Sequence, residues 1–106
     1  RARLRSEQPA KPNTALVFEL EIENRDAATK ADLVYEIQTP GKVEGRPRKQ
    51  RFRAGAVELP GFCTASFHIR ERIFDRKAAQ LIDGECAALF LLNGEQVAEV
   101  RFPLER

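Results

Sequence analysis

Stretches in which apolar and polar residues alternate one by one constrain the fold of this chain most strongly. The clearest is residues 15–24, ALVFELEIEN, where every second side chain is apolar and the residues between are mostly glutamates. A period of two places the apolar side chains on one face of a β-strand and the charged ones on the other. Residues 31–38, 62–70 and 96–104 show the same alternation. The pattern predicts strands that each bury one face.

Turn signals separate these stretches. Pro40-Gly41 and Pro60-Gly61 each interrupt the chain, and Asn93-Gly94 lies between two strand-like segments. Asn-Gly in that place predicts a two-residue type I′ hairpin, because that turn needs positive φ at both of its residues. Residues 85–93 are apolar on both faces, which is typical of a central strand.

The remaining segments are less regular. Residues 1–5 and 48–54 are expected to form further strands, the second of them weak. Residues 71–82 are expected to form a crossover loop with a possible short helix, too short for a parallel β-α-β unit. The prediction is an all-β fold, an antiparallel immunoglobulin-like β-sandwich of six to seven strands. An open barrel is the alternative.

Length and composition indicate one folded domain over residues 1–106. A chain of 106 residues buries about two-thirds of its unfolded surface, and 42% hydrophobic residues argue against disorder. No apolar run approaches the roughly 20 residues of a membrane span, and no secretory signal is visible. We therefore expect no membrane association and a cytoplasmic location.

Residues suited to catalysis or metal binding are scarce. His68 is the one histidine and is expected on an outer strand face without a partner to orient it. Cys63 and Cys86 alternate with apolar residues, so both are expected to be buried and reduced. We predict no catalytic residue, no metal site, no cofactor and no small-molecule substrate.

Charges of opposite sign follow two segments near the start of the chain. Glu19, Glu21 and Glu23 share one face of their strand, about 6.6 Å apart, which is too far for a compact cation site. Arg1, Arg3 and Arg5 repeat the same spacing. Rows of salt bridges between the two segments are therefore predicted.

The segment 42–53 concentrates positive charge, with six cations against Glu44, although the whole chain has a net charge of only +2. Such a segment can contact phosphates, but with Phe52 as its only aromatic residue it offers little for base stacking. The alternative is a solvated edge strand that its charges protect from aggregation. Either way, exposed cations are expected to contribute little to stability. The tentative nucleic-acid-binding residues are Lys42, Arg46, Arg48, Lys49, Arg51 and Arg53.

Residues 33–104 resemble a known type of domain. A basic strand bearing Phe52 leads into the turn VELPG (57–61), and a strand ending in LNG (92–94) leads into AEVRFPL (98–104). In this order the segments resemble the C-terminal immunoglobulin-like extension of bacterial DNA alkylation repair-like proteins, which are built of HEAT repeats. The alkyl-base-binding residues of that family belong to the helical solenoid, which is not part of this sequence. The resemblance implies an accessory module without glycosylase activity of its own.

The functional prediction combines the resemblance with the basic segment. We expect a non-catalytic accessory or interaction module that makes weak contact with the DNA backbone or docks on a helical-repeat domain or protein. The alternative is a secreted or periplasmic immunoglobulin-like domain that binds protein.

Overall fold

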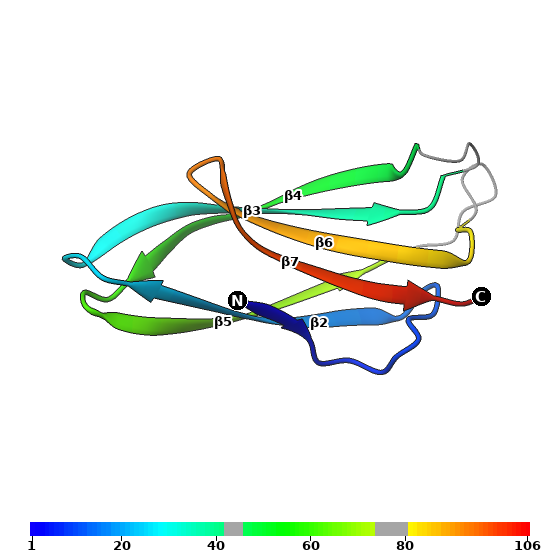
Figure 1. Cartoon of the computed structure of the whole chain (residues 1–106), viewed down its shortest axis with the longest axis horizontal. Coiled ribbons are helices and arrows are strands. Elements are labelled where there is room, and N and C mark those ends of the chain that lie inside the picture. The colour runs from blue at the N-terminus through cyan, green and yellow to red at the C-terminus, as the bar shows by residue number, and fades with distance from the viewer. Residues whose placement is uncertain (42–45, 74–80) are drawn as a thin grey trace.

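The computed structural model describes residues 1–41, 46–73 and 81–106, and every regular element in them is a β-strand (Figure 1). Of the loop and helix expected over 71–82, residues 71 and 72 belong to a strand, and 74–80 lie outside the described residues. The strands are β1 (Ala2–Leu4), β2 (Ala15–Asn24), β3 (Thr29–Thr39), β4 (Arg48–Leu59), β5 (Cys63–Arg72), β6 (Gly84–Leu92) and β7 (Glu95–Leu104).

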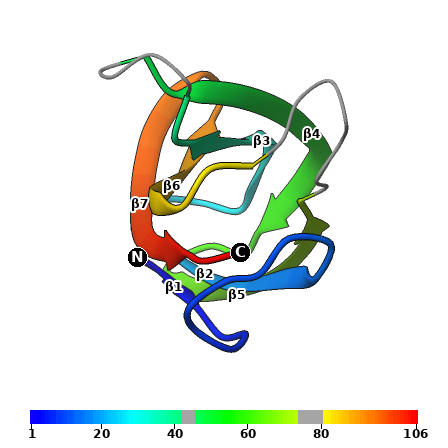
Figure 2. The ribbon, with the colours of Figure 1, turned by 90° about the vertical axis from the view of Figure 1, so that its right-hand side faces the viewer.

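The strands form two antiparallel sheets that pack face to face (Figure 2). One sheet has the order β1-β2-β5 and the other the order β4-β3-β6-β7. Two separate sheets confirm the predicted sandwich and exclude the open barrel. The molecule is elongated along its strands and measures 47 × 25 × 20 Å.

The two long sides of the sandwich differ. On one side β1 contacts β7, and Ala10 forms a parallel bridge with Leu104. The Ala10 amide donates to the Pro103 carbonyl at 2.8 Å, and the Glu105 amide donates to the Ala10 carbonyl at 2.9 Å. The other long side is bordered by the edge strands β4 and β5, which are joined by a short turn (Figure 2).

The core lies between the sheets and follows the predicted alternation. Phe18 is fully buried, with its ring centroid 5.6 Å from that of Phe90 and 5.9 Å from that of Phe102, both in edge-to-face geometry. The predicted inward residues of β2 and β3 are all buried, and those of β7 are buried or half-buried. They are Leu16, Phe18, Leu20, Ile22, Leu33, Tyr35, Ile37, Ala98, Val100, Phe102 and Leu104.

The predicted hairpin between β6 and β7 is confirmed. Asn93 and Gly94 are the two residues between the strands, and their φ angles are +50° and +83°. Asn93 also anchors the turn to β3, because its side-chain oxygen accepts a hydrogen bond of 2.9 Å from the Asp32 amide. Its own amide donates to the Asp32 carbonyl at 2.9 Å.

The strand predicted over 48–54 is longer in the structure and reaches Leu59. The register between β3 and β4 shifts at Leu33 and Val34, opposite Gly55, whose φ is +96°. A bulge of this kind adds a residue to one strand and reverses the inward and outward positions beyond it. This break in alternation explains why the sequence pattern predicts only the first half of β4.

The cysteine prediction is half right. Both thiols are free, as expected, but only Cys86 is buried and Cys63 is exposed. Cys63 has the inward parity of its strand, yet it is the first residue of β5 and lies at the end of the sandwich. Its neighbours Phe62 and Thr64 are exposed as well. Parity alone therefore does not bury a residue at the end of a sheet.

We expect a thiol-specific reagent to modify the native protein once, at Cys63. Burial, assisted by the nearby Glu85 carboxylate, raises the pKa of the Cys86 thiol to about 11, so this group supplies almost no thiolate at neutral pH. Mass spectrometry should show one fast modification, with a second only after unfolding. The Cys63→Ser variant should remain unmodified while folded. Equal rates at the two cysteines would contradict the structure.

Candidate nucleic-acid interface

The basic segment lies along an edge of the four-stranded sheet. Lys42 falls outside the described residues, Arg46 precedes β4, and the other four cations belong to β4 itself. Among the described residues β4 pairs only with β3, so it is an edge strand of its sheet. The structure thus places a row of cations on an edge strand, as the sequence predicted.

Alternation divides this segment between the two faces of the sheet. Phe52 points inward and stacks on Tyr35, with ring centroids 5.2 Å apart and planes 21° apart. Lys49, Arg51 and Arg53 have the opposite parity and lie on the outer face. Phe52 is therefore a core residue and is not available for stacking on a base.

Two of these cations already have partners on the neighbouring strand. An Arg51 guanidinium nitrogen lies 3.3 Å from a Glu36 carboxylate oxygen, and Arg53 Nε lies 3.2 Å from an Asp32 oxygen. The alternation in 31–38 predicts that both acids lie on the outward face of β3, but it does not predict their pairing with β4. The sequence does contain a signal for these ion pairs, because two consecutive strands carry opposite charges at outward positions.

The burial of Glu36 corrects the prediction from the alternation in 31–38, which places its side chain on the exposed face of the strand. Glu36 does lie on the outer face, but its exposed fraction is only 8%. Gln38 donates a hydrogen bond to its second carboxylate oxygen at 2.8 Å. The bonds from Gln38 and then Arg51, with Lys49 nearby, lower the pKa of this carboxyl against the opposing effect of burial. Arg51 therefore has a structural role.

Among the described cations of the segment, Arg46 and Lys49 are the most available to a ligand. Both are exposed, and neither forms an ion pair or a side-chain hydrogen bond with a described residue. Arg48 is half-buried. Arg53 keeps three-quarters of its side chain exposed despite its contact with Asp32, so it can also reach a ligand. Among the described cations of the segment, Arg46, Lys49 and Arg53 can therefore reach a ligand.

The opposite sheet carries a second group of charges. Glu19 is contacted by Arg3 at 2.6 Å, Arg5 at 3.8 Å and His68 Nε2 at 3.6 Å. The hydrogen bond from Arg3 is the main cause that lowers the Glu19 pKa. The predicted row of separate pairs becomes one cluster around Glu19, and the predicted outward position of His68 is confirmed.

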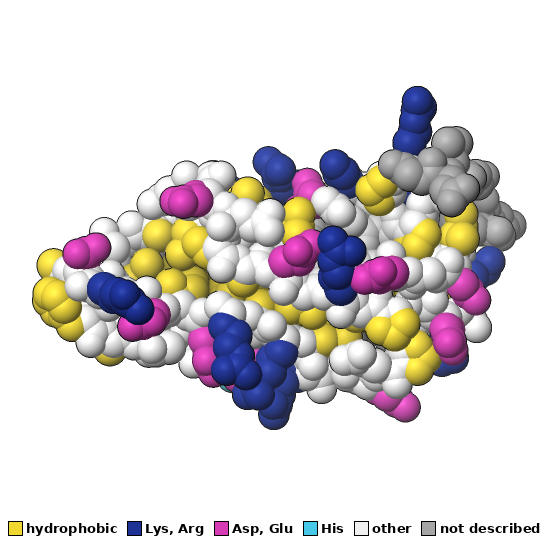
Figure 3. Space-filling model, viewed as in Figure 1, with side chains coloured by type: hydrophobic (Ala, Val, Ile, Leu, Met, Phe, Trp, Pro, Cys, Tyr) yellow, Lys and Arg dark blue, Asp and Glu magenta, His cyan; other side chains and the backbone are white. Residues whose placement is uncertain are grey.

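Figure 3 shows basic and acidic side chains interspersed over one broad side of the molecule, without a large area of single sign. Within residues 1–41, 46–73 and 81–106, no group of three or more His, Cys, Asp or Glu side chains is placed to hold a metal ion. No helix in this part of the chain is long and apolar enough to cross a membrane.

Comparisons with known proteins reveal a shared fold. No family model and no curated protein matches the chain. It is similar to Pseudomonas fluorescens alkylpurine DNA glycosylase AlkC, solved bound to DNA containing an abasic site analog, with a TM-score of 0.77 and 18% identity. That match covers 99% of this chain and 30% of the glycosylase.

A second solved structure has the same fold. It is a variant of the β-glucosidase from Listeria innocua in complex with laminaribiose, with a TM-score of 0.70 and 16% identity. The match covers all of this chain but 16% of the glucosidase. The chain therefore spans less than a third of either protein. At these identities the likeness concerns the fold alone.

Proposed function

We propose that this chain is a non-catalytic accessory module that contacts the phosphate backbone of DNA weakly, through the edge of β4. The observation that carries the proposal is the position of Arg46, just before the edge strand β4, and of Lys49 on that strand. Both are exposed, and neither forms an ion pair with a described residue. When cations in such a place bind the phosphate backbone, counterions condensed on the DNA are released. This release favours binding without reference to sequence.

The similar structures support an accessory role. The same fold makes up a minor part of two enzymes with different substrates, a DNA glycosylase and a β-glucosidase. A fold shared by unlike enzymes does not specify an activity. The first of these proteins is solved bound to DNA, which agrees with a phosphate ligand. Two free thiols agree with a reducing, cytoplasmic location.

The chemistry of the segment favours contact with phosphates rather than with bases. Arg46 and Lys49 lie on a loop end and an extended strand, and Phe52 is held in the core by Tyr35. The described residues supply no helix that could enter the major groove. With only a few cations in reach, we expect a dissociation constant of about 10⁻⁴ M at physiological salt.

Replacing Arg46 and Lys49 with alanine should weaken binding to duplex DNA about tenfold at low salt, because two phosphate contacts are lost. The measurement is fluorescence anisotropy with a labelled duplex of about 20 base pairs, which at about 3.4 Å per pair exceeds the 47 Å length of the protein. The matched control replaces Lys11 and Lys30, two exposed cations elsewhere on the surface.

The control variant loses the same charge and should bind nearly as well as the parent. Equal losses in both variants would indicate a nonspecific charge effect, and no binding by the parent would remove DNA as the ligand. A docking role toward a helical-repeat domain or protein would then be favoured.

A further inference from the structure

Two arginines outside the basic segment are exposed and have no ion-pair partner among the described residues. Arg70 and Arg72 alternate along β5 with the buried Ile69 and the half-buried Glu71, so they lie on the outer face of the three-stranded sheet. No described carboxylate lies within ion-pair distance of either one. Across the sheet they face Val17 and Ala15, which carry no charge.

The acidic residue between them does not neutralise this pair. Glu71 has the opposite parity and faces Leu16, which is buried in the core. Burial raises the pKa of the Glu71 carboxyl, and burial followed by the Glu71 charge raises the pKa of Tyr35. The half-buried Glu71 side chain thus lies on the inward face of β5, and both arginines remain available on the outer face.

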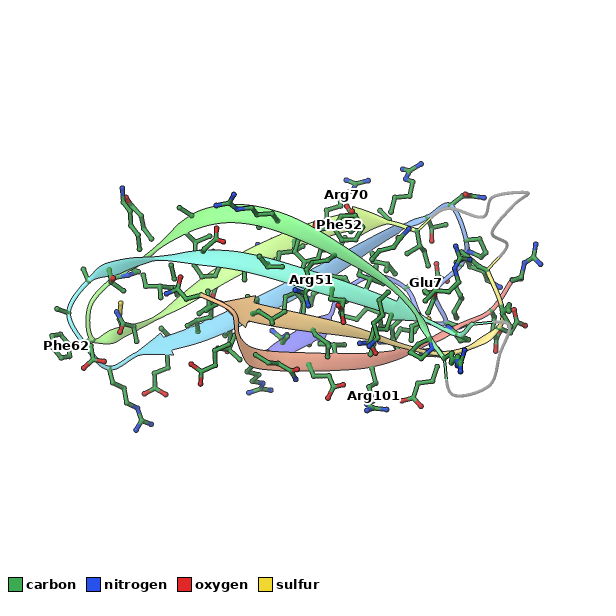
Figure 4. All side chains as sticks on the ribbon, turned by 90° about the horizontal axis from the view of Figure 1, so that it is seen from above. Glu7, Arg51, Phe52, Phe62, Arg70 and Arg101 are labelled. Atoms are coloured by element: carbon green, nitrogen blue, oxygen red, sulfur yellow. The ribbon has the colours of Figure 1, made fainter. Side chains whose placement is uncertain are left out.

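These arginines border the same long side of the sandwich as the basic segment. β5 is the edge strand of its sheet and β4 the edge strand of the other, whereas the β1 and β7 edges are joined on the opposite side. Figure 4 shows Arg70 projecting from this side at the level of Phe52 along the long axis. Cations of both sheets therefore flank one open side.

We propose that the DNA-contacting surface extends across this open side, with Arg70 and Arg72 forming a second row of phosphate contacts opposite Arg46 and Lys49. This inference rests on the proposed function and adds two residues that the basic segment does not contain. The surface is defined by these four residues and is called the two-row surface below.

The geometry suits a sugar-phosphate backbone. Residues two apart on a strand are about 6.6 Å apart, and packed sheets lie about 10 Å from each other. Both rows lie on outer faces, so their side chains are farther apart than the packed sheets, and we expect each row to meet its own stretch of sugar-phosphate backbone. Guanidinium groups can also bind phosphate oxygens through two parallel hydrogen bonds.

The test is the variant Arg70→Ala/Arg72→Ala, titrated with the same labelled duplex at several salt concentrations. We expect affinity at low salt to fall about tenfold and the slope of log K against log salt to become shallower by about 2. The thermal midpoint should not change, because neither side chain forms an ion pair with a residue in 1–41, 46–73 or 81–106. The Lys11→Ala/Lys30→Ala variant again controls for net charge.

A second variant, Arg70→Lys/Arg72→Lys, retains both positive charges. It shows whether a loss of binding in the alanine variant comes from the lost charges or from a folding defect. It should keep the parent salt slope while losing part of the affinity, because lysine lacks the forked geometry. If the parent binds and Arg46→Ala/Lys49→Ala weakens it, but Arg70→Ala/Arg72→Ala does not, the two-row surface is refuted and the proposed function stands. If the parent does not bind DNA, both proposals fail.

Discussion

Replacing Phe18 with alanine should lower the free energy of unfolding by about 3–5 kcal/mol, the usual cost of truncating a buried phenylalanine. Phe18 is fully buried on the central strand of its sheet and contacts Phe90 and Phe102 of the opposite sheet. The substitution would leave a cavity between the two layers and remove both edge-to-face contacts. A domain of this size has about 5–15 kcal/mol of stability in total, so much of it would be lost. Urea denaturation followed by circular dichroism measures the effect.

The matched control is the same substitution at Phe62, whose side chain is 77% exposed. Phe62 lies in the turn between β4 and β5 and buries little apolar surface, so its removal should change stability by less than about 0.5 kcal/mol. Similar losses at the two positions would contradict the assignment of the core.

Replacing Arg51 with alanine should lower the free energy of unfolding by about 1–2 kcal/mol, more than an exposed arginine normally contributes. Its partner Glu36 retains only 11% of its side-chain exposure and would be left with the single hydrogen bond from Gln38. Arg25→Ala is the matched control, because Arg25 pairs with Glu23 at 3.2 Å but both side chains are mostly exposed. That control should lose less than about 0.5 kcal/mol.

The Arg51 effect should depend on pH in a defined direction. Contacts with Gln38 and Arg51 lower the pKa of Glu36 below its ordinary value of 4.5. A carboxyl whose pKa is lowered by folding stabilises the folded protein above its unfolded pKa, and this contribution is lost as pH falls through the folded pKa. The difference between parent and Arg51→Ala should therefore be full at pH 7 and shrink below about pH 4. A difference that is independent of pH would show that the ion pair is not its cause.

The strands could be predicted from the sequence wherever one face is buried and the register is regular. Alternation in 15–24 gave both the bounds and the inward residues of β2, and Asn93-Gly94 gave the hairpin with its positive φ angles. Prediction was wrong where alternation fails for a local reason. The bulge at Gly55 interrupts the alternation, so the pattern does not predict the second half of β4. Cys63 is exposed because it lies at the end of its strand, beyond the part that the core buries.

The candidate interface could be predicted only in part, because it depends on which strands are neighbours. The cluster of cations at 46–53 is local in the sequence, but their partners Asp32 and Glu36 become visible only when β3 pairs with β4. Arg70 and Arg72 form no cluster in the sequence. Only the sheet order, which makes β5 and β4 the edges of one open side, relates them to the basic segment.

The salt dependence of DNA binding by the parent domain tests most directly whether it contacts phosphates without reading sequence. With four cations on the two-row surface, log K should fall against log salt with a slope between about −3 and −4, since each phosphate contact contributes about 0.9. Two duplexes of equal length and unrelated sequence should give the same affinity and the same slope. Affinity that does not change with salt, a strong preference for one duplex, or no binding at low salt would contradict the proposed function.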